Sequence, residues 1–211
     1  DYLLVSEKVK SNLVASLIKE IERAFGKNQK KSDDYGRIAH VDHFKNLKSA
    51  IKDEKIIYGA KTEEKSLFFS PTLVESPDKE SILMKEEIFG PILPIIPYRE
   101  EVEIHHFLKS QERPLAFYVF SKRNKFIKQV FNRYSFGGGV ANDSIIQFAN
   151  DNLPFGGVGQ SGMGAYHGKY SFRNFSHEKP FINRSFWFDV PGRYAPYPKS
   201  LTLLKFLLKN I

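Results

Sequence analysis

Hydrophobic positions along the chain recur with two spacings, which predict that strands and helices alternate. Residues 2–5 form a short apolar run that predicts a strand. The next stretch has the 3.6-residue periodicity of a helix, with Ser6 as a candidate N-cap and Gly26 directly after its end. Its apolar face consists of Leu13, Leu17, Ile18, Ile21 and Phe25. The chain therefore opens with a strand that leads directly into an amphipathic helix.

The same spacings continue toward the other end of the chain. Helical segments are predicted at residues 41–51, 81–87, 102–108 and 125–134, and strands at 56–58, 67–73, 115–120, 137–142 and 180–188. The strand at 115–120 is entirely apolar, so we expect it to be buried on both faces. This order predicts an α/β fold, with a mostly parallel, open sheet that is flanked by helices.

One apolar run, PILPIIPY at residues 91–98, contains three prolines. Proline has no backbone N–H and cannot donate to a sheet ladder, which confines it largely to edge strands and bulges. We therefore expect this element to be short, bulged or at the edge of the sheet.

Composition narrows the class of protein. With 211 residues, 41% of them hydrophobic and 27% charged, the chain can form one sizeable globular domain or two small ones. No apolar run approaches the roughly 20 residues that span a bilayer, and the first residues do not resemble a secretory signal. Because the chain starts without Met and runs straight into a strand, we expect it to be a fragment or a processed piece. We expect the protein to be cytoplasmic.

The charge and the side-chain chemistry exclude several kinds of site. The net charge of +8 raises the possibility of a nucleic-acid partner, but the lysines are scattered, so we expect none. The chain has no cysteine, which excludes a disulfide, a thiolate metal site and a thiol nucleophile within it. His40 and His43 with Asp42, and the pair His105–His106, do not provide three convergent ligands, so no metal is expected.

The most conspicuous motif is glycine-rich, LPFGGVGQSGMGAYHGK at residues 153–169. Gly157, Gly159 and Gly162 have the G-x-G-x-x-G spacing of a dinucleotide-binding turn. The residues before them are polar and include a proline, however, and the glycines after them do not favour the start of a helix. A folded surface loop with several positive φ angles is the better interpretation.

The whole segment resembles the P-F-G-G-x-G-x-S-G-x-G block of the aldehyde dehydrogenase superfamily, and SGMGAYHGKYSF is similar to the class 3, fatty-aldehyde-like branch. Other blocks agree in order. They are KKSDDYGRI (30–38), MKEEIFGPILPI (84–95), RPLAFYVFS (113–121), GGGVAND (137–143) and SFRNFSHEKP (171–180). The resemblance extends from Asp1 to about Pro198. It implies an enzyme that oxidises aldehydes to carboxylic acids with NAD or NADP.

The resemblance also implies where the catalytic groups lie. In that family the nucleophilic cysteine lies a few residues before an A-P-D-Y stretch, and this chain opens with Asp1-Tyr2. The chain therefore resembles the C-terminal half of the catalytic domain, cut just after the nucleophile. The cysteine, the general-base glutamate and the cofactor loop would all precede it. No catalytic residue is expected within the chain, and the isolated chain is expected to be inactive.

Some positions match residues that bind cofactor or substrate in the family. Glu87 matches a glutamate that binds the hydroxyls of the nicotinamide ribose, and Phe89 matches an aromatic that packs near the nicotinamide ring. Phe155 matches a wall of the aldehyde pocket. His167 either faces that pocket or is a structural imidazole. Asn142 matches an asparagine near the active site, for which we expect mainly backbone hydrogen bonds.

The remaining expectations concern loops, termini and assembly. Residues 145–152 would form a variable loop over the substrate entrance. Residues 1–178 would form the catalytic domain, 179–190 an oligomerisation strand that joins a partner's sheet in a homodimer, and 191–211 a tail. The apolar tail either packs on protein or associates with a membrane, of which packing is the simpler interpretation. Two alternatives stay open: an acylating relative within the superfamily, and a non-catalytic interaction module.

Overall fold

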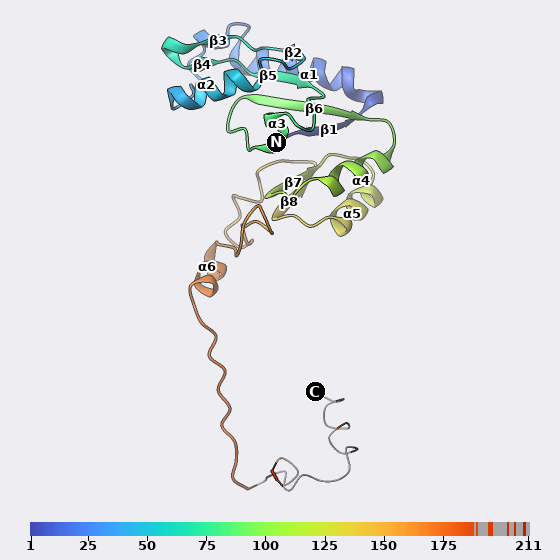
Figure 1. The fold of residues 1–211 in the computed structure, drawn as a ribbon, viewed down its shortest axis with the longest axis vertical. Helices are drawn as coiled ribbons and strands as arrows, with labels where there is room; N and C mark the ends of the chain where they lie inside the picture. Colours follow the sequence, from blue (N-terminus) through green and yellow to red (C-terminus); the bar gives the residue numbers. More distant parts are fainter. Residues whose placement is uncertain (188, 190–193, 196–201, 203–204, 206–208, 210–211) are drawn as a thin grey trace. The chain divides into compact units, whose positions relative to one another are not determined.

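The computed structural model describes residues 1–187, 189, 194–195, 202, 205 and 209. The described chain forms two compact units (Figure 1). Unit 1 consists of residues 1–114 and 159–161, and unit 2 of the residues from 115 to 158 and from 162 onward. Each is an α/β arrangement with its own hydrophobic cluster.

Unit 1 is built on a four-stranded sheet in the order β1-β6-β5-β2. The strands are β1 (Leu3–Ser6), β2 (Ile56–Tyr58), β5 (Thr72–Glu75) and β6 (Ile92–Tyr98). β6 pairs in parallel with both β1 and β5, whereas β2 pairs antiparallel to β5. The prediction was an α/β class with a mostly parallel sheet, and the structure confirms the α/β class with a partly parallel sheet flanked by helices.

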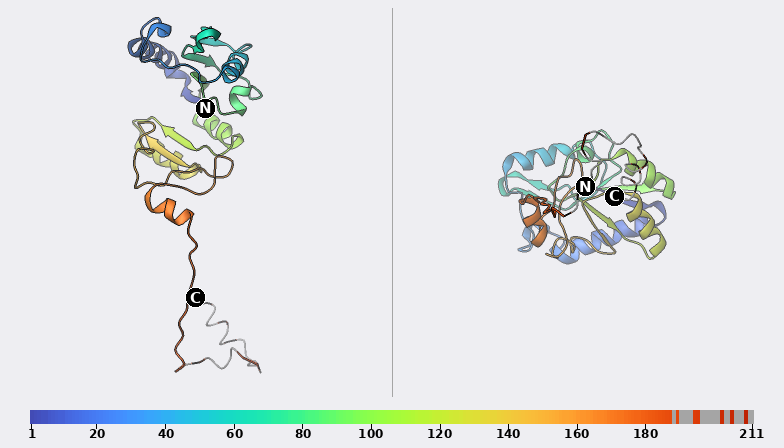
Figure 2. Two further views of the ribbon diagram at one scale, coloured as in Figure 1. Left: turned by 90° about the vertical axis from the view of Figure 1, so that its left-hand side faces the viewer. Right: turned by 90° about the horizontal axis from the view of Figure 1, so that it is seen from below.

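Two helices cover opposite faces of this sheet (Figure 2). Helix α1 (Glu7–Phe25) follows β1 directly and packs on the face that carries Leu73 and Ile95. Helix α2 (Val41–Ala50) packs on the other face, which carries Val74. Neighbouring strand residues point to opposite faces, so β5 contributes Leu73 to one core and Val74 to the other. Both helices lie where the sequence periodicity predicts them.

Shorter elements complete unit 1. They are η1 (Gln29–Lys31), the hairpin of β3 (Thr62–Glu63) and β4 (Phe68–Phe69) with η2 (Glu64–Ser66) between its strands, α3 (Ile82–Lys85) and α4 (Glu101–Ser110). The strand predicted at 67–73 is therefore wrong in detail, because it is two strands, β4 and β5, separated by Ser70 and Pro71. Two features interrupt the predicted strand. Pro71 has no N–H to donate to a sheet ladder, and Leu67, the first residue of the predicted strand, has a φ of +50°, which is not a strand conformation.

The prediction for the proline-rich run is also wrong. β6 is seven residues long and lies between two neighbours, with Pro94 opposite Val74 and Pro97 opposite Val5. Each proline removes one donor, and a backbone hydrogen bond has a net value of about 1 kcal/mol. Burying one large aliphatic side chain contributes about 1.5–3 kcal/mol. Ile92 and Ile95 are both buried, so the packing outweighs the lost donors.

Unit 2 contains the parallel pair β7 (Ala116–Val119) and β8 (Gly138–Ala141), connected through α5 (Asn124–Arg133). Val119, Ile127 and Val130 form its buried cluster between strand and helix. The expectation that residues 115–120 are buried on both faces is wrong for this chain. Tyr118 is exposed, since α5 packs on one face of the two-stranded sheet and Tyr118 points away from Val119.

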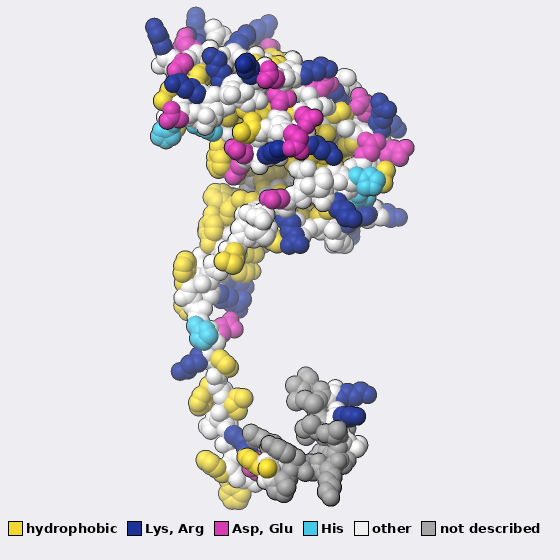
Figure 3. All heavy atoms as spheres, viewed as in Figure 1, with side chains coloured by type: hydrophobic (Ala, Val, Ile, Leu, Met, Phe, Trp, Pro, Cys, Tyr) yellow, Lys and Arg dark blue, Asp and Glu magenta, His cyan; other side chains and the backbone are white. Residues whose placement is uncertain are grey.

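A long loop after β8 carries the glycines and leads to α6 (Gly168–Asn174). Residues 176–187 then belong to no helix or strand, so the described part of the strand predicted at 180–188, residues 180–187, is not in a strand. A strand needs a neighbour for its backbone hydrogen bonds, and none is present beside this segment among the described residues. Position 188 lies outside the described residues. Hydrophobic side chains in this segment are exposed (Figure 3).

Candidate functional site

The motif that matches the cofactor contacts is a short loop in unit 1. We call residues 86–90 the EEIFG loop; it follows α3 and precedes β6. Ile88 is buried at 5% exposure, whereas Glu87 is exposed and Phe89 is 75% exposed. The loop thus anchors itself through one side chain and presents a carboxylate and an aromatic ring to the outside.

The EEIFG loop lies beside the first residue of the chain. The amide of Ile88 donates a hydrogen bond to Oδ2 of Asp1 at 3.3 Å. Burial lowers the pKa of the Asp1 amino group, and the nearby carboxylate of Glu87 partly offsets this effect. Burial also raises the pKa of the neighbouring Tyr2 to about 12. Glu87 and Phe89 therefore belong to the same region as the chain's first residues.

The exposed groups of the loop fit a nicotinamide nucleoside. Glu87 forms no ion pair or side-chain hydrogen bond with any described residue, so both carboxylate oxygens can accept from a vicinal diol. An exposed aromatic side chain two residues away offers a flat apolar surface for a planar ring. Covering the exposed Phe89 ring with another apolar surface would be favourable, because it removes apolar area from water.

Asn142 directly follows β8 in unit 2 and has a φ of +59°. Its amide N–H donates to the carbonyl of Val119 at 2.9 Å, and its side-chain oxygen accepts from the amide of Ser121 at 2.8 Å. The side chain thus ties the end of β8 to the turn after β7. The expectation of mainly backbone hydrogen bonds agrees with this geometry.

Phe155 and His167 lie together in unit 2. Phe155 forms an antiparallel bridge with Tyr166, with backbone hydrogen bonds of 3.1 and 2.9 Å. The His167 ring lies 6.0 Å from the Phe155 ring, and its Nδ1 donates to the carbonyl of Leu153 at 3.2 Å. Because a carbonyl oxygen only accepts, Nδ1 carries a proton in this hydrogen bond.

Two further aromatic residues complete this group, which we call the aromatic cluster: Phe148, Phe155, Tyr166 and His167. Neighbouring ring centroids within it are 4.6 to 6.0 Å apart. Phe148 and Tyr166 were not singled out from the sequence, although Tyr166 lies in the glycine-rich motif and Phe148 in the loop at 145–152. Their common feature, partial exposure of a large ring, appears only in three dimensions.

The glycine-rich loop has the conformation that its context predicts. Gly159, Gly162 and Gly164 have positive φ angles, and no strand leads into Gly157. α6 begins only at Gly168, six residues after the last glycine of the spacing. A dinucleotide turn requires a strand before it and a helix directly after it, so this loop lacks that architecture.

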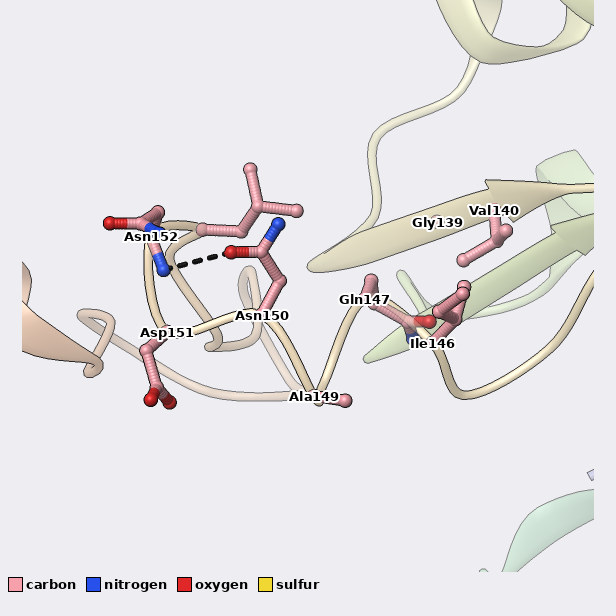
Figure 4. Close-up of a pocket in the computed structure, with 9 residues that line it drawn as sticks. Gly139, Val140, Ile146, Gln147, Ala149, Asn150, Asp151 and Asn152 are labelled. Atoms are coloured by element: carbon pink, nitrogen blue, oxygen red, sulfur yellow. Dashed lines mark hydrogen bonds between the residues drawn. The ribbon is translucent and has the colours of Figure 1, made fainter.

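A recess of about 600 Å³ lies in unit 2 between β8 and the loop that follows it (Figure 4). It is lined by Gly139, Val140, Ile146, Gln147, Ala149, Asn150, Asp151, Asn152 and Leu153. The Gln147 amide donates to the hydroxyl of Tyr118 at 3.0 Å, while its oxygen is buried without a partner among the described residues. The family resemblance predicts a variable loop over the substrate entrance at residues 145–152, and the Gln147 oxygen gives the recess beside this loop a polar acceptor.

The described side chains elsewhere form neither a metal centre nor a patch of one charge on the visible face of unit 1. Across the residues that the structure describes, no three His, Asp or Glu side chains converge as metal ligands. On the face of unit 1 in Figure 3, basic and acidic side chains are interspersed. None of the helices in the described part of the chain is both long and apolar enough to cross a bilayer.

Comparison with known proteins shows which protein family this chain resembles. A model of the aldehyde dehydrogenase family matches residues 1–181. The chain is 41% identical to 4,4'-diaponeurosporen-aldehyde dehydrogenase of Staphylococcus aureus, covering 100% of the chain and 46% of the relative. It is 46% identical to mouse aldehyde dehydrogenase family 3 member A2, covering 99% and 44%.

Solved structures agree with these relatives. An aldehyde dehydrogenase from Staphylococcus aureus in a substrate-bound state matches with a TM-score of 0.85 and 40% identity, covering 100% of this chain and 46% of that one. A glyceraldehyde-3-phosphate dehydrogenase from Methanocaldococcus jannaschii complexed with NADP matches with a TM-score of 0.70 and 28% identity, covering 82% and 38%. The chain therefore spans less than half the length of these proteins.

Proposed function

Because the chain belongs to the aldehyde dehydrogenase family, we propose that it forms the C-terminal part of an NAD(P)-dependent catalytic domain that oxidises aldehydes to carboxylic acids. In this proposal a cysteine thiolate on polypeptide preceding Asp1 attacks the aldehyde carbon. The cofactor, when bound, accepts the hydride that leaves that carbon. A water activated by a glutamate, also outside this chain, then hydrolyses the thioester and releases the acid.

The observation that carries the proposal is the position of the EEIFG loop. The Ile88 amide bonds to Asp1, so the exposed Glu87 and Phe89 lie next to the point where polypeptide carrying the nucleophile would enter. Hydride transfer requires the reacting carbon and the nicotinamide ring to be held together, which favours cofactor contacts close to the nucleophile.

Each of the two exposed residues then has a physical role. Glu87 accepts hydrogen bonds from the two hydroxyls of the nicotinamide ribose, and charged acceptors make the stronger kind of hydrogen bond. Phe89 covers one face of the nicotinamide ring and excludes water from it. Together they hold the cofactor without taking part in bond making, so this chain supplies binding and orientation.

The aromatic cluster of unit 2 supplies the proposed aldehyde contact. Phe155 is the residue that the family resemblance assigns to this role. His167, Phe148 and Tyr166 extend the ring surface around it. Such a surface favours aldehydes with hydrocarbon or aryl substituents. Asn142 holds the end of β8 and acts on the site through the backbone.

A second candidate, an interaction module, is favoured by the segment after α6. Phe181, Ile182, Phe186 and Trp187 are each more than four-fifths exposed. We propose that this segment associates with a partner chain in a homodimer, in a cytoplasmic protein, alongside the enzymatic role.

Turnover tests the main proposal. The 211-residue chain, mixed with NAD⁺ or NADP⁺ and a hydrophobic aldehyde, should form no reduced cofactor, because it contains no cysteine. The same chain preceded by the N-terminal part of the staphylococcal relative, including its nucleophile, should form reduced cofactor. Turnover by the short chain would contradict the placement of the nucleophile, and an inactive, correctly folded fusion would favour the interaction module.

A further inference from the structure

We propose that His43 is a positioning residue for the cofactor site, because it fixes the peptide group that orients Phe89. This inference rests on the proposed function, in which Phe89 contacts the nicotinamide ring. His43 lies in the first turn of α2, and its Nε2 is 2.9 Å from the backbone carbonyl oxygen of Phe89. Since a carbonyl oxygen only accepts, Nε2 carries the proton and donates.

The backbone at Phe89 needs such support. Its φ is +45°, in the left-handed region that residues with a Cβ rarely adopt and that persists only where the surroundings hold it. The side chain cannot provide that hold, because it is 75% exposed. The hydrogen bond from His43 acts directly on the peptide group that follows Phe89. It therefore stabilises the conformation that keeps the ring outside the core.

Neighbouring residues of the EEIFG loop are fixed to the same helix. Ile88 packs in the cluster that contains Phe44 and Leu47 of α2. A Cβ on Gly90 would lie 2.6 Å from Leu47 Cδ1, so the loop backbone runs against this helix. His43 and Leu47 are four residues apart and lie on one face of α2. Side-chain packing thus holds Ile88 and Gly90, and the His43 hydrogen bond holds the residue between them.

A purely structural histidine would behave differently from a positioning residue. Loss of a structural contact would destabilise the unit as a whole, whereas loss of the His43 bond should release one loop while Ile88 remains in the core. His43→Gln is the conservative variant, because its amide nitrogen is separated from Cγ by the same number of bonds as Nε2. His40→Ala is the matched control: it lies at the start of the same helix, and its side chain makes no capping hydrogen bond.

Amide hydrogen exchange of the 211-residue chain tests the inference without any cofactor. His43→Ala should speed amide exchange at Ile88, Phe89, Gly90 and Ile92 by about three- to tenfold, the loss expected for one hydrogen bond. Exchange elsewhere in α2 and in the sheet should stay as in the wild type. His43→Gln should restore protection, and His40→Ala should not change it. Unchanged exchange in His43→Ala, or a loss spread over all of unit 1, would overturn the inference.

Cofactor affinity provides the second readout, measured by titration of NAD⁺ or NADP⁺ into the fusion with the relative's N-terminal part. His43→Ala should weaken binding by about three- to tenfold, with the KM for aldehyde unchanged, and His43→Gln should recover most of it. Full affinity in His43→Ala despite a released loop would overturn the inference. A wild-type fusion that binds no cofactor would instead refute the proposed function, while the exchange experiment would still decide whether His43 holds the loop.

Discussion

Gly156 shows how closely the backbone of the glycine-rich loop is packed. A Cβ at this position would lie 2.1 Å from the carbonyl oxygen of Gly164 and 2.8 Å from the Cα of Ala165. Both are backbone atoms, which cannot turn aside as a flexible side chain can. Gly156 therefore serves the close approach of the two chain segments that carry Phe155 and Tyr166, a requirement unrelated to a pyrophosphate.

We expect Gly156→Ala to destabilise unit 2 by about 1–3 kcal/mol, the usual cost of forcing extra volume into a packed site. Gly36→Ala is the control, because no atom lies within 4 Å of its added Cβ. Denaturant unfolding monitored in unit 2, for example through amide exchange of β8, would measure the difference. Equal stability of the two variants would show that the loop backbone can separate freely.

Glu87 is the residue on which the proposed cofactor contact depends. Glu87→Gln should weaken NAD⁺ or NADP⁺ binding by about tenfold or more, since hydrogen bonds to a charged group have net values of about 1.5–3 kcal/mol. Glu86→Gln is the matched control, an exposed neighbour in the same loop. The affinities would be measured in the fusion with the relative's N-terminal part. If both variants lost equal affinity, net charge rather than a specific contact would explain binding.

Among the elements, α1 and the sheet of unit 1 are joined by a charged cluster as well as by apolar packing. Glu75 on β5 forms ion pairs with Lys10 of α1 and with Lys55. Hydrogen bonds from these two lysines, with their charge, hold the pKa of Glu75 below its ordinary value of 4.5. The carboxylate is therefore favoured in the folded chain.

This depressed pKa predicts how stability changes with pH. The ion pairs contribute fully above about pH 4.5, the ordinary pKa, and their contribution is lost as the pH falls through the lower pKa of the folded chain. Glu75→Gln should lower the unfolding free energy near neutral pH and make its decline in acid shallower. Glu112→Gln should leave the slope unchanged, because Glu112 is exposed and forms no ion pair with any described residue. A wild-type slope in Glu75→Gln would contradict this account.

The sequence predicted most elements of this fold, and the errors have physical causes. Periodicity located α1 and α2, since each has one continuous apolar face. The prediction for β6 was wrong, because it considered only the hydrogen-bond donors that the prolines remove. It did not consider the free energy gained by burying Ile92 and Ile95 on the two faces of the sheet. The burial of β7 was overestimated, since an apolar run does not reveal how many layers cover a strand.

The candidate site divides in the same way. Glu87, Phe89 and Phe155 could be located because each belongs to a motif with fixed wording. His43, Phe148 and Tyr166 could not, because their importance comes from contacts between segments far apart in the sequence. The His43 ring meets a carbonyl 46 positions later in the chain. No local pattern encodes such a contact.

At the scale of the molecule, the described segment after α6 carries several hydrophobic side chains that are almost fully exposed. Phe186 and Trp187 are essentially fully exposed, and Phe181 and Ile182 nearly so. Neighbouring apolar side chains left in water favour association with another surface. This is the physical basis for the proposed homodimer.

We expect the chain to self-associate with increasing concentration, and the double variant Phe181→Ser, Trp187→Ser to remain monomeric over the same range. Val9→Ser, which changes an exposed side chain on α1, should behave as the wild type. Sedimentation velocity would distinguish the species. If all three proteins associate equally, another surface is responsible. If all three remain monomeric, the proposed homodimer is excluded.

The central proposal is that the chain supplies a cofactor-binding wall beside the entry point of a nucleophile-bearing segment. The most direct test is a crystal structure of the fusion with the relative's N-terminal part, bound to NAD⁺ or NADP⁺. We predict that both hydroxyls of the nicotinamide ribose lie within hydrogen-bonding distance of the Glu87 carboxylate, with the Phe89 ring against the nicotinamide. A nicotinamide ring bound away from both residues would contradict the claim.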